Sequence, residues 1–245
     1  MSPLQRNEEV LREMELWPVW KRRTTACAEA VSQPPAATGV MPSAQRREVL
    51  KPGVGLDGAD WQALKEQVAK CTACGLCKQR KQAVFGVGNE SAPWLFVGEG
   101  PGADEDAQGE PFVGQAGKLL DSMLAAIRLQ RGREVYITNV VKCRPPGNRV
   151  PTAEEAAACA PYLDRQIDLI SPRLIVALGK TAATRLLGVD ASLASQRGKL
   201  HRYRGFPVII TYHPAYLLRN LQDKAKAWED LVFARQTMGS LLQKA

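Results

Sequence analysis

Four short apolar runs, rich in β-branched residues, follow one another along the chain after residue 60. Gly98, Gly179 and His213 directly follow three of the runs, and Asn139 lies near the end of the remaining run; Gly and Asn are residue types that favour turns. Short runs without polar alternation are typical of strands buried on both faces of a parallel sheet. The four predicted strands are residues 94–97, 135–140, 174–178 and 208–212.

Stretches with helical periodicity lie between these runs and after the last of them. This alternation of strand and helix predicts an α/β protein built from β-α-β units. We expect a three-layer α/β/α sandwich around a central, mostly parallel, four-stranded sheet. The predicted helices are residues 118–127, 153–170, 181–187 and 224–242.

The first fifty or so residues have a different character. Apolar residues in 4–20 recur at nearly helical spacing, and residues 31–52 are rich in Ala, Pro, Ser, Gln and Gly. We therefore expect an N-terminal helix and flexible linker over residues 1–53, and one folded domain over 54–245. The helix is either a docking element for a partner protein or an appendage packed on its own domain.

Charge and cysteine content limit the class of binding partner and the cellular compartment that we expect. The 245-residue chain has 33 Lys and Arg against 25 Asp and Glu, a net charge of +8 that favours a polyanionic partner such as nucleic acid. No long apolar segment predicts a membrane span, and charged residues replace an apolar signal core near the N-terminus. We expect a reducing, cytoplasmic location, where disulfides are a poor explanation for six cysteines.

Four of the cysteines form two separated pairs. Cys71 and Cys74 are a tight C-x-x-C, while Cys143 and Cys159 lie far downstream and must be brought to them by the fold. Four thiolates suit either zinc or an iron–sulfur cluster, and the spacing alone does not choose between them. Cys77 is surplus to a four-ligand site, and we assign it to a packed turn.

The residues that could bind a ligand or take part in catalysis lie at the ends of the predicted strands. In open α/β sheets, ligands bind at the carboxyl ends of the strands, where Gly98, Asn139, Gly179 and His213 follow or close the four runs. The Gly-rich turn at Gly98 lacks the third glycine of a dinucleotide fingerprint, which weakens the reading as a nucleotide-binding oxidoreductase.

Three motifs, in order, resemble those of family 4 uracil-DNA glycosylases. They are Gly98-Glu99-Gly100-Pro101-Gly102 with Pro111-Phe112-Val113-Gly114, then Thr138-Asn139 with Lys142-Cys143-Arg144-Pro145-Pro146, and finally His213-Pro214-Ala215-Tyr216-Leu217-Leu218-Arg219. The resemblance extends from about residue 61 to the C-terminus. It implies a monofunctional DNA repair enzyme that hydrolyses the N-glycosidic bond of uracil and leaves an abasic site. It also implies a 4Fe-4S cluster on Cys71, Cys74, Cys143 and Cys159.

The chemistry of base removal agrees with these residues. An excised base must leave the stack, be held by its edge and have its developing negative charge stabilised. Phe112 offers a face for stacking, and the Asn139 amide suits the O4 and N3–H edge of uracil. His213 can donate a hydrogen bond to O2.

The resemblance also assigns positions to the acidic residues. The resemblance places Glu99 at the rim of the pocket, beside Gly98 and Gly100, and Glu105 opposite C5 of the base, where it excludes the methyl group of thymine. Gly100 stands where better-known relatives carry a water-activating aspartate. The group that positions water therefore stays open between Glu99, Glu105, Asp106 and main-chain carbonyls.

DNA contacts are expected on both sides of the pocket. Leu217 or Leu218 is the candidate for a wedge that fills the gap left by the flipped base. The loop after Asn139 contains no histidine, which favours turnover over the covalent attachment made by a related family. The candidates for phosphate contacts are Lys142, Arg144, Arg149 and Arg219.

The competing hypothesis is a non-catalytic, cluster-bearing DNA-binding or polymerase-associated module. Its support is Gly100, whereas pure binding does not require a donor such as His213 beside a base-reading amide. On the enzyme hypothesis we expect a monomer that acts near the nucleoid on uracil in single- or double-stranded DNA. The N-terminal helix is then a candidate docking site for a replication or repair protein.

Overall fold

The protein is described by a computed structural model that covers residue 56 and residues 58–243. The predicted N-terminal helix, the linker and Cys27 lie outside the described residues. In the described part, no helix is long and apolar enough to cross a membrane.

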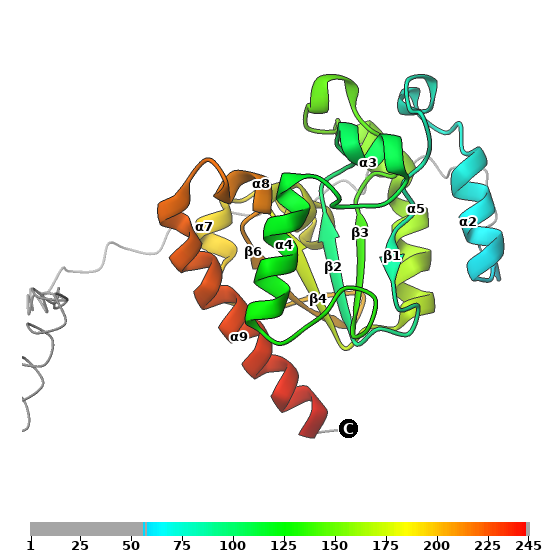
Figure 1. Cartoon of the computed structure of the whole chain (residues 1–245). Helices are drawn as coiled ribbons and strands as arrows, with labels where there is room; N and C mark the ends of the chain where they lie inside the picture. The colour runs from blue at the N-terminus through cyan, green and yellow to red at the C-terminus, as the bar shows by residue number, and fades with distance from the viewer. Residues whose placement is uncertain (1–55, 57, 244–245) are drawn as a thin grey trace, which may run out of the picture. The chain divides into compact units, whose positions relative to one another are not determined.

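A six-stranded sheet forms the centre of the fold, in the order β1-β3-β2-β4-β6-β5 (Figure 1). The inner strands β2, β3, β4 and β6 are parallel and correspond to the four predicted strands. The two edge strands, β1 and β5, pair antiparallel and were not predicted, because two or three residues are too few to show a pattern. The bounds are β1 Val87–Gly88, β2 Trp94–Gly98, β3 Val135–Asn139, β4 Leu174–Leu178, β5 His201–Tyr203 and β6 Phe206–Thr211.

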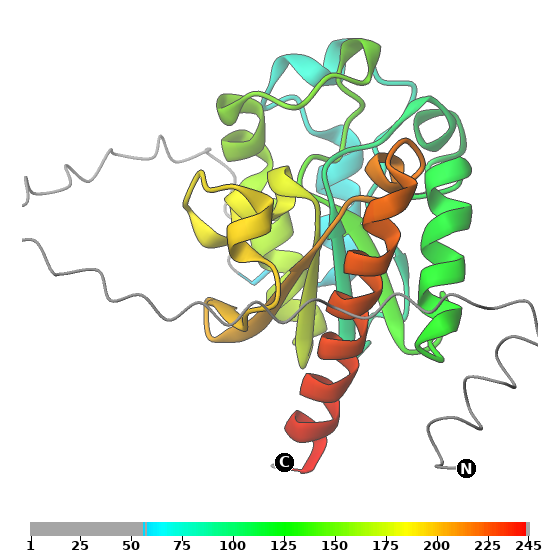
Figure 2. The same ribbon diagram turned by 90° about the vertical axis from the view of Figure 1, so that its left-hand side faces the viewer.

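The inner strands are buried on both faces, as continuous apolar runs require. Trp94 and Phe96 of β2 point into one core, which also contains residues of α4 (Gln115–Ala126) and α9 (Lys224–Gln243). Leu95 and Val97 point into the other core, against α2 (Trp61–Lys70), α5 (Ala153–Ile170) and α6 (Lys180–Leu187). The two views in Figures 1 and 2 show helices on both sides of the sheet, so the predicted three-layer sandwich is confirmed.

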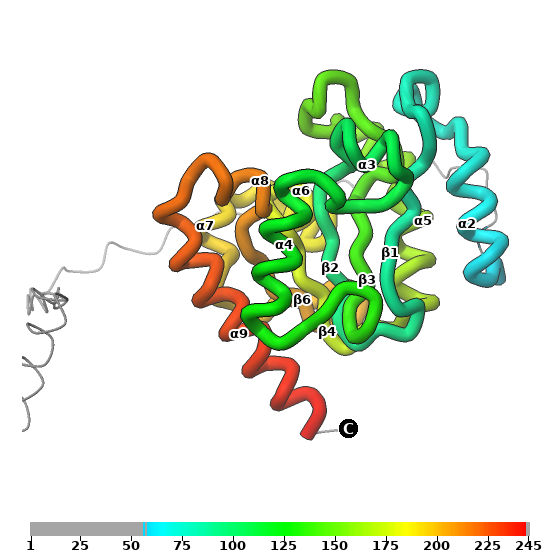
Figure 3. The backbone as a smooth tube through the Cα atoms, viewed as in Figure 1, coloured from blue at the N-terminus to red at the C-terminus, as the bar shows by residue number. Residues whose placement is uncertain are grey.

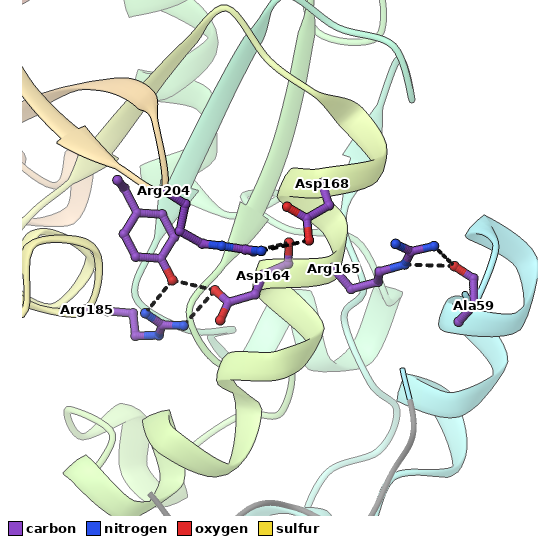
Figure 4. Close-up of polar contacts among 7 residues, drawn as sticks. Ala59, Asp164, Arg165, Asp168, Arg185 and Arg204 are labelled. Atoms are coloured by element: carbon purple, nitrogen blue, oxygen red, sulfur yellow. Dashed lines mark hydrogen bonds and ion pairs between the residues drawn. The ribbon is translucent and has the colours of Figure 1, made fainter. Parts of the chain in front are cut away.

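Helix α5 connects several segments that are distant in the sequence (Figure 4). Its Asp164 accepts hydrogen bonds from Arg185 of α6 at 2.7 Å and from Tyr203 of β5 at 2.6 Å. Arg165 donates to the Ala59 carbonyl at 2.8 Å, which holds the segment before α2. The helix begins at a capping box, in which Thr152 and Glu155 satisfy each other's main-chain N–H groups.

Short elements lie in the connections of the fold, with η1 before β1 and α7 between α6 and β5. The others, α3, η2, α8 and η3, lie in the loops after the carboxyl ends of β2, β3 and β6, where Figure 3 shows α3 and α8 on the backbone trace. These loops carry the first and third sequence motifs. The short elements are η1 Gly75–Lys78, α3 Ala103–Gln108, η2 Pro146–Asn148, α7 Leu193–Gln196, α8 Pro214–Leu217 and η3 Leu221–Asp223.

Candidate active site

An open pocket of about 480 Å³ lies at the carboxyl ends of the parallel strands. The connections after β2 and β4 leave toward opposite faces of the sheet, which creates the crevice where α/β proteins bind ligands. Most of the predicted catalytic and base-binding residues line it: Glu99, Gly100, Glu105, Phe112, Asn139 and His213.

Asn139 ends β3 directly beside Gly98, the last residue of β2. A Cβ at Gly98 would clash with Asn139 Oδ1 and lie 2.6 Å from Phe112 Cζ, so glycine is needed for these two side chains to approach each other. Asn139 is buried, and its Oδ1 has no hydrogen-bond partner among the described residues. A buried amide oxygen without a protein partner is available to accept a hydrogen bond from a ligand in the pocket.

Phe112 is held in an unusual backbone conformation next to Asn139. Its φ is 57°, in the left-handed region, and Arg131 stabilises the turn by donating to the carbonyls of Pro111 at 2.8 Å and Phe112 at 2.9 Å. Gly117 permits this turn, because any Cβ there would overlap the Phe112 carbonyl. A strained conformation that is held this firmly is typical of functional loops.

His213 follows β6 and lies across from Phe112, with ring centroids 5.5 Å apart. Its Nδ1 accepts a hydrogen bond from the main-chain N–H of Ala215 at 3.2 Å. In the neutral ring this leaves the proton on Nε2, which becomes a donor. Burial, followed by the charge of Arg219, lowers the pKa of His213 to about 4, so the ring is neutral at pH 7.

Glu105 lines the pocket, but its carboxylate is engaged with the main chain. It accepts from the N–H groups of Gly102 at 3.0 Å, Val113 at 3.0 Å and Gly114 at 3.1 Å. These contacts join the Gly98–Gly102 turn to the Phe112 loop. The structure therefore gives Glu105 a role in loop architecture that the sequence analysis did not anticipate.

The two other acidic residues, Asp106 and Glu99, have different surroundings. Asp106 is buried and accepts from the Lys81 main-chain N–H at 2.9 Å. Glu99 lines the pocket, and its Oε2 accepts a hydrogen bond from Thr181 at the start of α6. This contact crosses the crevice between β2 and β4. Thr181 was missed as a site residue, although its position after the third strand in Gly179-Lys180-Thr181 was the signal.

The basic residues divide into exposed and buried groups. Arg149 and Arg219 line the pocket, and Arg144 lies in the same loop as Arg149, with its Nε donating to Asn148 at 2.7 Å. Lys142 does not belong with them: it is 1% exposed and bonded internally. The expectation that it contacts phosphate is wrong, because the fold turns this side chain toward α5.

The wedge candidates are also distinguished by burial. Leu217, which was expected to contact DNA, is 1% exposed and packs in a core with residues of α4 and α9. Leu218 is 41% exposed. Of the two, only Leu218 presents its side chain to solvent near the pocket.

The cysteines surround a second, much smaller hollow of about 10 Å³. Cys71, Cys74, Cys143 and Cys159 line it as predicted, and Cys77 lines it too, which the assignment to a packed turn did not foresee. In the described residues no three of the side chains are close enough to coordinate a single metal ion. Several thiols gathered around one hollow are nevertheless the ligand type that an iron–sulfur cluster takes.

Hydrogen-bond donors already point at these sulfurs. Arg80 donates to Cys143 Sγ at 2.9 Å, and the main-chain N–H of Lys142 donates to Cys159 Sγ at 3.3 Å. Such donors stabilise thiolates bound to a cluster. The donor set and its surroundings therefore fit an iron–sulfur cluster, and Arg80 is a contributor that the sequence analysis missed.

A family model described as "Uracil DNA glycosylase superfamily" matches residues 85–232, which include the whole pocket. The chain belongs to this superfamily. Among its relatives, the type-4 uracil-DNA glycosylase of Thermotoga maritima is 48% identical over 165 residues, covering 66% of this chain and 85% of the relative.

Two other type-4 uracil-DNA glycosylases are similar to this chain to about the same degree. That of Archaeoglobus fulgidus is 48% identical over 160 residues, 62% of this chain and 80% of the relative. That of Pyrobaculum aerophilum is 45% identical over 180 residues, 70% of this chain and 91% of the relative. The resemblance to the type-4 family within the superfamily is confirmed.

Proposed function

We propose that this protein is a uracil-DNA glycosylase that hydrolyses the N-glycosidic bond of uracil in DNA, releases the free base and leaves an abasic site. The observation that carries the proposal is the buried Oδ1 of Asn139. This atom has no hydrogen-bond partner among the described residues, and Asn139 lines the same pocket as His213. A base-reading amide and a neutral hydrogen-bond donor in one pocket are what uracil excision requires.

Uracil matches Asn139 in both hydrogen-bonding senses. The Oδ1 atom accepts from N3–H of the base, and the Nδ2 group donates to O4. Cytosine presents an amino group where uracil presents O4, and its N3 carries no proton, so both contacts fail. Phe112 supplies the stacking face, an interaction worth about 1–3 kcal/mol per base.

His213 stabilises the leaving group. As the glycosidic bond breaks, negative charge develops on the base, and Nε2–H of the neutral ring donates to O2. A positioned donor of this kind contributes about 3–4 kcal/mol to lowering the barrier. Because the ring is neutral before the reaction, its contribution is a hydrogen bond and not a full positive charge.

We assign the positioning of water to Glu99. Glu105 and Asp106 are both engaged with main-chain N–H groups, whereas Glu99 lines the pocket and is bonded through only one carboxylate oxygen among the described residues. Thr181 holds that oxygen, which leaves Oε1 to orient the attacking water.

Cys71, Cys74, Cys143 and Cys159 would hold a 4Fe-4S cluster. When bound, the cluster supplies a covalent clamp between the segment before η1 and the loop after β3. This clamp would hold the loop that carries Arg144 and Arg149, which contact DNA phosphates together with Arg219. Leu218 is then the side chain that enters the space left by the flipped nucleotide.

The test is to incubate purified protein with matched single-stranded oligonucleotides that carry uracil or thymine, and then to treat them with alkali. Strand cleavage at uracil alone supports the proposal. Intact uracil DNA that still shifts on a native gel would instead favour a non-catalytic binding module.

A further inference from the structure

Lys142 takes no part in the proposed removal of the base, yet its ammonium group is fully hydrogen-bonded. The side chain is 1% exposed, and Nζ donates to Thr138 Oγ1 at 2.6 Å, to the Asn139 carbonyl at 2.8 Å and to Gln166 Oε1 at 2.5 Å. An ammonium has three hydrogens, and each has an acceptor here.

Each acceptor is itself held by a further contact. Thr138 Oγ1 donates to the Phe85 carbonyl at 2.9 Å, and Gln166 Nε2 donates to the same carbonyl at 3.0 Å. Lys142 therefore lies at the centre of a buried network that joins the end of β3 to α5 and to the segment before β1. Fully satisfied networks of this kind are rigid.

The network fixes the peptide group that follows Asn139. Its carbonyl is held by Lys142 Nζ, and its N–H, which belongs to Val140, donates to the Gly98 carbonyl at 2.9 Å. Both polar atoms of this peptide are thus bonded to different parts of the fold. In contrast, the Asn139 side-chain oxygen has no partner among the described residues, so side-chain hydrogen bonds at Oδ1 do not orient the amide.

We propose that Lys142 is a positioning residue: by holding the Asn139 carbonyl, it aims the Asn139 amide at the base. This inference rests on the proposed function. It adds that the recognition of uracil depends on a buried cation that never touches DNA. Loss of comparable supporting contacts elsewhere lowers activity by about 10- to 100-fold.

The test is a double-mutant cycle with Lys142→Met and Asn139→Ala, measured as single-turnover uracil excision at saturating enzyme. Methionine keeps most of the unbranched apolar chain of lysine and removes the donors. We expect Lys142→Met to slow the wild-type protein by about 10- to 100-fold and to slow the Asn139→Ala protein no further, because its effect passes through Asn139.

A purely structural role, or a role through the nearby cysteines, would slow both backgrounds equally. Equal slowing overturns the proposal, as does a Lys142→Met protein with the wild-type rate. If Lys142→Met does not fold, Gln166→Met replaces it in the same cycle, since Gln166 holds the ammonium from α5. The same pattern is expected, and the same results would overturn it.

The wild-type arm keeps the two hypotheses apart. A wild-type protein that does not excise uracil refutes the proposed function. A wild-type protein that does, combined with additive effects in the cycle, refutes only the role of Lys142. Met238→Ala, a cavity in the core on the other face of the sheet, serves as the control for general destabilisation.

Discussion

Gly98 and Asn139 occupy paired positions at the ends of β2 and β3, close enough that no Cβ fits between them. This relationship brings the base-reading amide against the Phe112 ring and makes the glycine part of the site. The pocket therefore depends on the absence of a side chain at Gly98 as well as on the side chains of Asn139 and Phe112.

We expect Gly98→Ala to abolish most of the uracil excision and to lower stability by about 1–3 kcal/mol, because the new methyl group displaces Asn139 and Phe112. Gly239→Ala is the matched control, since a Cβ there meets nothing within 4 Å. In a helix this substitution should raise stability by about 0.5–1 kcal/mol. Thermal unfolding and excision rates measure both. Wild-type excision by Gly98→Ala would contradict the account.

Leu217 and Leu218 should respond in opposite ways to truncation. Leu217→Ala removes a core side chain and should lower stability by about 2–5 kcal/mol. Leu218→Ala should leave the melting temperature nearly unchanged and reduce excision from duplex DNA, where the flipped base leaves a gap to fill. Equal effects of the two substitutions on both measurements would disprove the assignment.

The low pKa of His213 has a defined sign for pH dependence. Burial depresses it from an ordinary value of about 6.5 to about 4, so the unfolded chain binds the extra proton first. The stabilising contribution is complete above about pH 6.5 and declines as the pH falls toward about 4. NMR titration of the imidazole nitrogens should show a neutral ring, protonated on Nε2, from about pH 6 to about pH 8. A ring that titrates near its ordinary pKa would refute the predicted state.

Arg80 should support the cysteine site through its hydrogen bond to Cys143. We expect Cys143→Ala to lose the brown colour and the bound iron. Arg80→Met should bind iron but release it to a chelator about tenfold faster. The exposed Arg133→Met serves as the control. Release at the same rate from both arginine variants would show that the Arg80 contact has no effect, and zinc in a colourless native protein would exclude the cluster.

Much of the fold was predictable because its inner strands are buried on both faces. A continuous apolar run such as residues 174–178 has one interpretation in an alternating β-α sequence, and its bounds agree with β4. The edge strands β1 and β5 arise from pairing with distant partners, which two or three residues cannot indicate.

The incorrect predictions at the site also arise because contacts with residues distant in the sequence decide which side chains are buried. Lys142 looks like a phosphate contact in a basic motif, but the position of α5 buries it. Leu217 ends a four-residue helix and Leu218 is its C-cap, so the helix is too short for periodicity to show which of the two faces the core. Cys77 was set aside by counting ligands, whereas the turn of η1 brings it to the hollow.

The most direct measurement of the central claim is single-turnover release of free uracil by the wild-type protein, Asn139→Ala and His213→Ala. The account predicts rapid release by the wild type and a loss of about 100- to 1000-fold in the His213 variant, with a similarly large loss for Asn139. Near-wild-type release by both variants, or no release by the wild type, would contradict it.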